Sequence, residues 1–237
     1  MGLYSLIKFG QKEHLEALRS DGLLYMKSLA DFAKLESDIA RGDGYEGTTH
    51  IIQPQHVGDL TLDLNARGRG KFAANPLDLA GPIRIGLNRT SECNVYCMFA
   101  ITGPIDGELV DSRNLAFGDC FVLVLNVNEF LNRVARATSQ ARLDCSCGPV
   151  EYFDSADYSG EVGRFRKRSL FAHQREFRIV VEPGCDQPRK LLVGSLVDIT
   201  SEVLPSEKVN QLLDFSTTSF RAAGLAERAT KGLEPAC

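Results

Sequence analysis

Hydrophobic and polar positions alternate most clearly late in the chain, between residues 171 and 181. Successive side chains of a β-strand point to opposite faces, so this alternation predicts a strand with one apolar and one polar face. A carboxylate fixed beside a carboxamide on one strand face is unusual for a strand that only fills a core. The apolar face carries Phe177, Ile179 and Val181, and the polar face carries Gln174, Glu176 and Arg178.

The same reasoning predicts helices and strands along the rest of the chain. Asn126 and Glu129 have the spacing of a capping box, which predicts a helix from about 127 to 138. An apolar stripe followed by Gly22 predicts another helix over 11–20. The strands expected are 3–9, 23–26, 94–101, 120–125, 149–153, 176–182 and 190–196, with a hairpin of 48–54 and 58–65, a loop over 65–82 and a helix from 205.

Helices therefore lie early and late, with strands between them, and this order is typical of an α+β fold. No linker rich in Pro, Ser or Gly divides the chain, so we expect residues 1–237 to form a single domain with a flexible tail from about 216.

Composition narrows the function classes only slightly. The net charge is −4, so contact with nucleic acid would need a local basic patch. No apolar run is long enough to cross a bilayer and the N-terminus lacks an export signal, which predicts a cytoplasmic protein without membrane partners. Seven cysteines without metal-site spacing indicate reduced thiols and no metal site.

Glu176 and Gln174 are the strongest candidates for chemistry. Cleavage of a glycosidic bond to ribose passes through an oxocarbenium-like state, which a nearby carboxylate stabilises. A glutamine on the same face could orient the incoming nucleophile. The alternative is a half-exposed strand on which Glu176 pairs with an arginine such as Arg178.

Other candidates are spread along the chain. Lys8, at the end of the first strand, could hold a diphosphate, and Tyr25 could stack on a nicotinamide-like ring. Asp43 lies in a Gly-rich loop and could contact ribose hydroxyls or a cation. The structural alternatives are a solvated lysine, a core aromatic and a turn residue. The basic run 164–168 could attract NAD phosphates, RNA or DNA, or could be a solvated loop.

Taken together, several short motifs resemble a family of bacterial and phage proteins whose general form is similar to the ADP-ribosyltransferase superfamily. The motifs are Lys-Phe-Gly at 8–10, Gly-Leu-Leu-Tyr-Met at 22–26, Arg-Gly-Asp-x-x-Glu-Gly at 41–47, Asn-Val-Tyr-Cys-Met-Phe at 94–99 and Gln-x-Glu-Phe-Arg at 174–178. The resemblance implies two packed, twisted, mainly antiparallel sheets with flanking helices around an NAD cleft.

The resemblance also implies roles for particular residues. A first-strand basic residue, a middle-strand Ser or Tyr and a late Glu surround NAD in that superfamily, and here Lys stands where Arg or His is usual. The implied roles are catalysis by Glu176 and Gln174 and NAD binding by Lys8, Tyr25, Phe32, Asp43 and Ser91. The local positive charge, and not the resemblance, suggests acceptor binding by Arg164, Arg166, Arg168 and Arg178.

The function expected on this basis is mono-ADP-ribosyl transfer from NAD to a nucleic-acid or protein acceptor. A role as a toxin or phage-defence effector, with an antitoxin or inhibitor as partner, would fit the resemblance. Two alternatives stay open: a non-catalytic module of the same fold that binds a nucleotide or a protein, and an NAD glycohydrolase. We expect Glu176→Gln to abolish turnover with little change in melting temperature.

Overall fold

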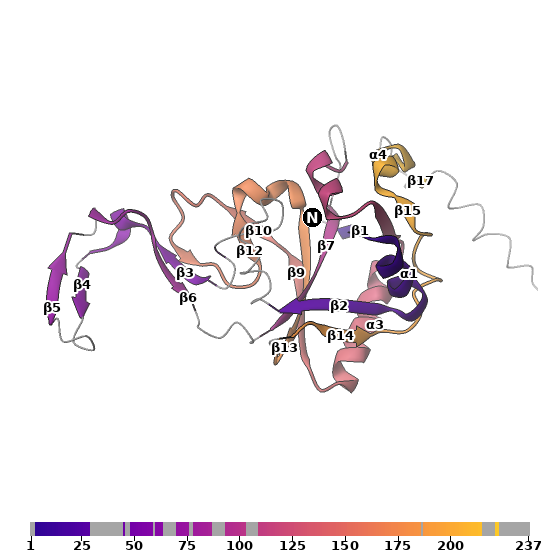
Figure 1. Ribbon diagram of the computed structural model, residues 1–237, viewed down its shortest axis with the longest axis horizontal. Helices are drawn as coiled ribbons and strands as arrows, with labels where there is room; N and C mark the ends of the chain where they lie inside the picture. Colours follow the sequence, from indigo (N-terminus) through magenta and orange to yellow (C-terminus); the bar gives the residue numbers. More distant parts are fainter. Residues whose placement is uncertain are drawn as a thin grey trace, which may run out of the picture.

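The computed structural model of the chain describes residues 3–28, 45, 48–58, 60–63, 70–75, 78–86, 93–102, 109–185, 187–214 and 221–222. The fold is α+β, with mostly antiparallel sheets and few helices (Figure 1). Three of the residues expected to bind NAD, Phe32, Asp43 and Ser91, lie outside the described residues.

An eight-stranded sheet forms the centre of the molecule. Its strands run in the order β14-β2-β7-β1-β8-β15, and β13 pairs with both β7 and β9. Their bounds are β1 Leu3–Gly10, β2 Leu23–Ser28, β7 Asn94–Thr102, β8 Cys120–Val124, β9 Asp144–Pro149, β13 Glu176–Glu182, β14 Arg189–Leu192 and β15 Leu204–Pro205.

The two middle strands, β7 and β13, are almost entirely buried, as their continuous apolar runs indicate. One face of the sheet packs against α1 (Lys12–Asp21) and α3 (Val127–Gln140). The opposite face packs partly against η5 (Ser112–Phe117) and α4 (Val209–Leu212). In the described part of the chain, helices therefore lie against both faces of the sheet.

The predicted start of α3 and the predicted end of α1 are confirmed. The side-chain oxygen of Asn126 accepts a hydrogen bond from the backbone N–H of Glu129 at 3.0 Å, which caps the start of α3. Gly22 ends α1 in the left-handed conformation, with φ at 66°. A Cβ atom at this glycine would lie 2.0 Å from the carbonyl oxygen of Gly194. Gly22 therefore lets the chain turn directly into β2.

The remaining strands form small sheets whose pairing was not all predicted. The expected hairpin of 48–54 with 58–65 is wrong, because β3 (Thr48–Ile52) pairs with β6 (Ile83–Gly86) and β11 (Gly160–Glu161). Ile51 is buried with Phe153 and Val162, so distant apolar contacts determine the partner of β3. Segment 60–63 is indeed a strand, β4 (Leu60–Asp63), but it pairs with β5 (Lys71–Ala74), inside the expected loop.

Short elements complete the described chain. The parallel pair β10 (Glu151–Phe153) and β12 (Arg166–Arg168) precedes the 3-10 helix η6 (Ser169–Gln174), which leads into β13. The helix expected from 205 is present as η7 (Ser206–Lys208) followed by α4. The others are η2 (Pro54–His56), β16 (Leu213–Asp214) and β17 (Arg221–Ala222). Within the described ranges, no helix combines the length and apolar character needed to cross a membrane.

Candidate functional site

The central sheet contains a split between β1 and β2. One edge of β7 pairs with β13 from Asn94 to Phe99. On its other edge, β1 pairs with β7 only as far as Phe99, and β2 pairs only with Val95 and Asn94. Strand β1 then continues along β8, while β2 continues along β14 (Figure 1). Among the described residues, no strand therefore pairs with that edge of β7 at residues 96–98.

A cavity of about 710 Å³ lies at this split. Its walls come from β1, β2, β7, β13 and β14, with α1 and η5 closing it from the two faces of the sheet. This volume falls within the usual range for small-molecule and cofactor sites. Four residues singled out from the sequence line this one cavity although they come from distant parts of the chain: Lys8, Tyr25, Gln174 and Glu176.

Glu176 lies at the start of β13 with only 5% of its surface exposed. The Nζ atom of Lys167 lies 3.0 Å from one carboxylate oxygen, and Nε of Arg178 lies 2.8 Å from the other. Burial alone would raise the pKa of Glu176, but the charges of Arg178 and Lys167 lower that pKa well below its ordinary value. The cavity wall therefore holds a carboxylate that stays ionised.

Gln174 does not lie on the strand that was predicted to carry it. It is the last residue of η6, and Arg175, with φ at 40°, turns the chain between that helix and β13. Gln174 nevertheless lies beside the carboxylate, because the Lys167 ammonium donates to its side-chain oxygen at 2.9 Å as well as to Glu176. The partner observed for the Gln174 side chain is therefore Lys167, and through this contact Gln174 positions the lysine.

Lys167 is the member of this group that the sequence analysis missed. Its neighbours Arg166 and Arg168 are partly exposed, whereas Lys167 is buried. Alternation within the short strand β12 therefore directs the lysine alone inward. The same alternation rule, applied to the basic run 164–168, would have singled it out.

Cys97 lies between Glu176 and the first strand. Burial, with the nearby charge of Glu176, raises the pKa of the Cys97 thiol, so Cys97 remains protonated. Its carbonyl oxygen accepts a hydrogen bond of 2.7 Å from Lys8, whose Nζ lies 4.3 Å from the centroid of the Tyr96 ring. Lys8 thus reaches into the split, beside the edge of β7 with which no described strand pairs.

A tyrosine hydroxyl contacts the backbone of the same glutamate. The backbone N–H of Glu176 donates to the hydroxyl oxygen of Tyr152 at 2.8 Å. Burial raises the pKa of Tyr152 to about 12, so this hydroxyl is neutral. The start of β13 is therefore held through both its backbone and its side chain.

Tyr25 is not a core aromatic. It lies on β2 at the cavity wall with 49% of its surface exposed, while its neighbours Leu24 and Met26 are buried. An exposed ring at a cavity is suited to stacking on a ligand.

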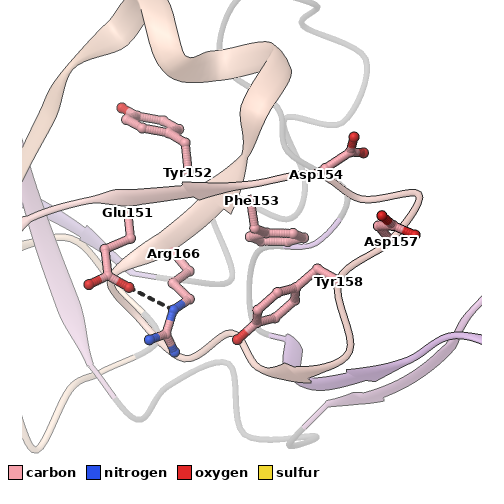
Figure 2. A pocket seen from close by; sticks show the side chains of 7 residues that line it. All are labelled: Glu151, Tyr152, Phe153, Asp154, Asp157, Tyr158 and Arg166. Atoms are coloured by element: carbon pink, nitrogen blue, oxygen red, sulfur yellow. Dashed lines mark hydrogen bonds and ion pairs between the residues drawn. The ribbon is translucent and has the colours of Figure 1, made fainter. Parts of the chain in front are cut away.

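The arginines expected to bind the acceptor mostly contact the protein itself. Arg164 pairs with Glu182, and the guanidinium of Arg168 lies 4.8 Å from the centroid of the Tyr45 ring. Arg166 pairs with Glu151 at 2.9 Å (Figure 2) and lines a second cavity, of about 450 Å³, around Phe153 and Tyr158. Arg178 is buried against Glu176. In the described residues, none of the four lines the cavity at the split.

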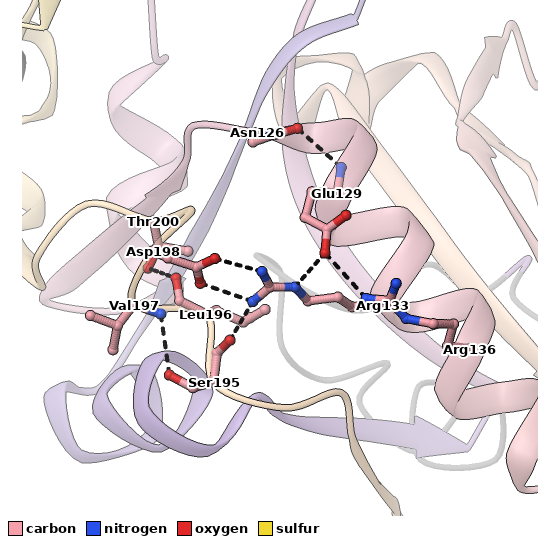
Figure 3. A network of polar contacts seen from close by, with 9 residues as sticks. All are labelled: Asn126, Glu129, Arg133, Arg136, Ser195, Leu196, Val197, Asp198 and Thr200. Carbon is pink, nitrogen blue, oxygen red and sulfur yellow. Dashed lines mark hydrogen bonds and ion pairs between the residues drawn. The ribbon is translucent and has the colours of Figure 1, made fainter. Parts of the chain in front are cut away.

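An ion-pair network fixes the segment that follows β14. Arg133 on α3 contacts both carboxylate oxygens of Asp198, at 2.9 and 2.6 Å, and one oxygen of Glu129 at 2.8 Å (Figure 3). It also donates to the carbonyl oxygen of Ser195. This network anchors segment 195–198, which follows β14, to α3.

The described ranges contain no cluster of three His, Cys, Asp or Glu side chains that could hold a metal ion. Comparisons of the chain with protein families, with curated proteins and with solved structures found no match.

Proposed function

We propose that this chain is a mono-ADP-ribosyltransferase that takes NAD into the cavity at the split between β1 and β2. The observation that carries the proposal is that one cavity connects the ionised carboxylate of Glu176 with Lys8 on β1 and Tyr25 on β2. The resemblance noted in the sequence requires these three positions to surround one ligand, and the fold brings them together.

The proposed reaction breaks the bond between nicotinamide and the ribose C1′ carbon. Nicotinamide leaves with the bonding electrons, and the positive charge that develops on the ribose is stabilised by the Glu176 carboxylate. A nucleophilic atom of the acceptor then bonds to C1′ and loses its proton to solvent. Lys167 and Arg178 hold the carboxylate in place, and Gln174 holds Lys167.

The acceptor in this proposal is a nucleic acid or a protein. A chain that modifies such targets would fit a toxin or phage-defence role controlled by an antitoxin or inhibitor. The site offers Tyr25 as a stacking surface for the nicotinamide ring.

One observation favours a second candidate, a non-catalytic nucleotide-binding module. Two cations, Lys167 and Arg178, surround the single carboxylate of Glu176, so this buried group carries a net charge of about +1. Such an arrangement can serve purely as a structural ion pair. In that case the cavity would bind a nucleotide without breaking it.

The test is incubation of the protein with NAD labelled in the adenylate phosphate, together with RNA, DNA and cell protein. We expect label on one class of macromolecule and release of an equal amount of nicotinamide. Free labelled ADP-ribose without transfer would indicate an NAD glycohydrolase. NAD binding without nicotinamide release would identify the binding module, and absence of both binding and turnover would refute the proposal.

Glu176 variants add the mechanistic test. Glu176→Gln removes the negative charge, and we expect nicotinamide release to fall about 100-fold or more. The same change leaves two buried cations without their counter-ion and should cost about 3–5 kcal/mol of stability. Thermal melting must therefore show that the variant is folded at the assay temperature. Glu176→Asp keeps the charge, and Glu151→Gln removes an exposed carboxylate outside the cavity as a matched control.

A further inference from the structure

The face of β2 that meets the cavity carries an aromatic residue followed by a cation. Leu24 and Met26 are buried in the core, so the alternate residues Tyr25 and Lys27 project from the other face. Both line the cavity at the split.

Strand β14 adds a second cation to the same face. Lys190 is the direct cross-strand partner of Tyr25, and its neighbour Leu191 is buried in the same core as Leu24. Residues opposite one another in an antiparallel pair share a face, and Lys190 also lines the cavity. The exposed Tyr25 therefore has two lysines as neighbours on its face, one two residues further along β2 and one across from it on β14.

These two lysines differ from the other cations of the cavity. Lys8 already donates to the Cys97 carbonyl, and Lys167 is paired with Glu176. Lys27 and Lys190, by contrast, form no hydrogen bond or ion pair within the described part of the chain. Four lysines and one carboxylate line this cavity in a protein whose net charge is −4. Such a local concentration of positive charge attracts an anionic ligand.

We propose that Lys27 and Lys190 bind the diphosphate of the dinucleotide, with the adjacent Tyr25 as the stacking surface for one of its rings. The sequence suggested Lys8 for binding the diphosphate. In this proposal that role belongs to Lys27 and Lys190, which the sequence did not single out. Directly opposed Cβ atoms lie about 5 Å apart and diagonal ones about 7–8 Å apart, so flexible lysine side chains can converge on adjacent phosphates. The inference rests on the proposed function only in taking the ligand to be a dinucleotide.

The test measures binding of ADP-ribose, inorganic pyrophosphate and adenosine by titration calorimetry. Lys27→Gln or Lys190→Gln should each weaken ADP-ribose binding about tenfold, and the double variant about 100-fold, because each removes one charge-assisted contact. Pyrophosphate should follow the same order. Adenosine, which has no phosphate, should bind the double variant as it binds the unmodified protein. Lys208→Gln removes an exposed lysine on η7, away from the cavity, and should change nothing.

Several results would overturn the inference: unchanged ADP-ribose affinity in the double variant, an equal loss in Lys208→Gln, or an equal loss for adenosine. The two proposals fail separately. Lysine-dependent ADP-ribose binding without nicotinamide release would sustain the phosphate site and refute transfer. Transfer that depends on Glu176 with an unchanged KM for NAD in the double lysine variant would sustain the enzyme and refute the phosphate site.

Discussion

At the residue scale, Glu176 combines two properties that usually exclude each other. It is buried as deeply as a core residue, yet it borders a cavity large enough for a ligand. Two cations offset the cost of burying its charge. The sequence-based expectation that Glu176→Gln would barely change the melting temperature is therefore replaced by an expected loss of stability.

The pKa of Glu176 leads to a test of Lys167 as a positioning residue. Lys167→Met removes one of the two charges that lower this pKa, so the pKa of the carboxyl rises. If turnover requires ionised Glu176, the acidic limb of the rate profile should move to higher pH in the variant. Lys167→Arg retains the charge and should restore most of the shift. An unmoved acidic limb in Lys167→Met would contradict the assigned role.

The pH dependence of the melting temperature should also show that Lys167 lowers the pKa of Glu176. A carboxyl whose pKa is lower in the folded state stabilises the fold above its unfolded pKa, and this contribution disappears as pH falls. The unmodified protein should therefore lose melting temperature as pH drops below about 4.5. Lys167→Met should start from a lower melting temperature and lose less over that interval. Parallel curves for the two proteins would show that Lys167 does not influence the carboxyl.

The same residues show how far the sequence could predict the site. Alternation placed Glu176 and Arg178 on one face of a strand, and both are there. It placed Gln174 on that strand wrongly, because the left-handed conformation of Arg175 that ends η6 has no signal in the sequence. Lys167 was missed because a run of five residues with four cations resembles a solvated loop.

At the scale of elements, local signals predicted the helices and most strands, whereas strand pairing depended on distant contacts. Asn126 and Gly22 act within one helical turn, so their effects could be read from the sequence. The split arises because β1 leaves β7 for β8 while β2 leaves it for β14. Those partners are distant in the chain, and no periodicity specifies them.

The turn at Gly22 determines where β2 begins and hence the position of the cavity wall. Gly22→Ala places a Cβ atom against the Gly194 carbonyl and strains a left-handed backbone. We expect a loss of more than about 1 kcal/mol in urea unfolding, together with weaker ADP-ribose binding. Gly58→Ala is the control, because a Cβ atom there would meet nothing within 4 Å. Equal stability of the two variants would show that the turn tolerates a side chain.

At the scale of the whole molecule, an acidic chain surrounds a basic cavity. Charge contrast of this kind attracts anions over a range set by ionic strength. ADP-ribose affinity should therefore fall as salt is raised from low to high concentration, and the double variant at Lys27 and Lys190 should be less sensitive to salt. Calorimetry at several salt concentrations measures both slopes, and equal slopes would place the phosphate elsewhere.

The central claim is that the split between β1 and β2 holds a dinucleotide, and amide hydrogen exchange with and without ADP-ribose tests it most directly. The account predicts slower exchange in segments 7–10, 23–27 and 95–99, which form the walls of the cavity. Segment 153–158, at the second cavity, should be unchanged. Protection at that second cavity instead, or no protection at the split under saturating ligand, would contradict the account.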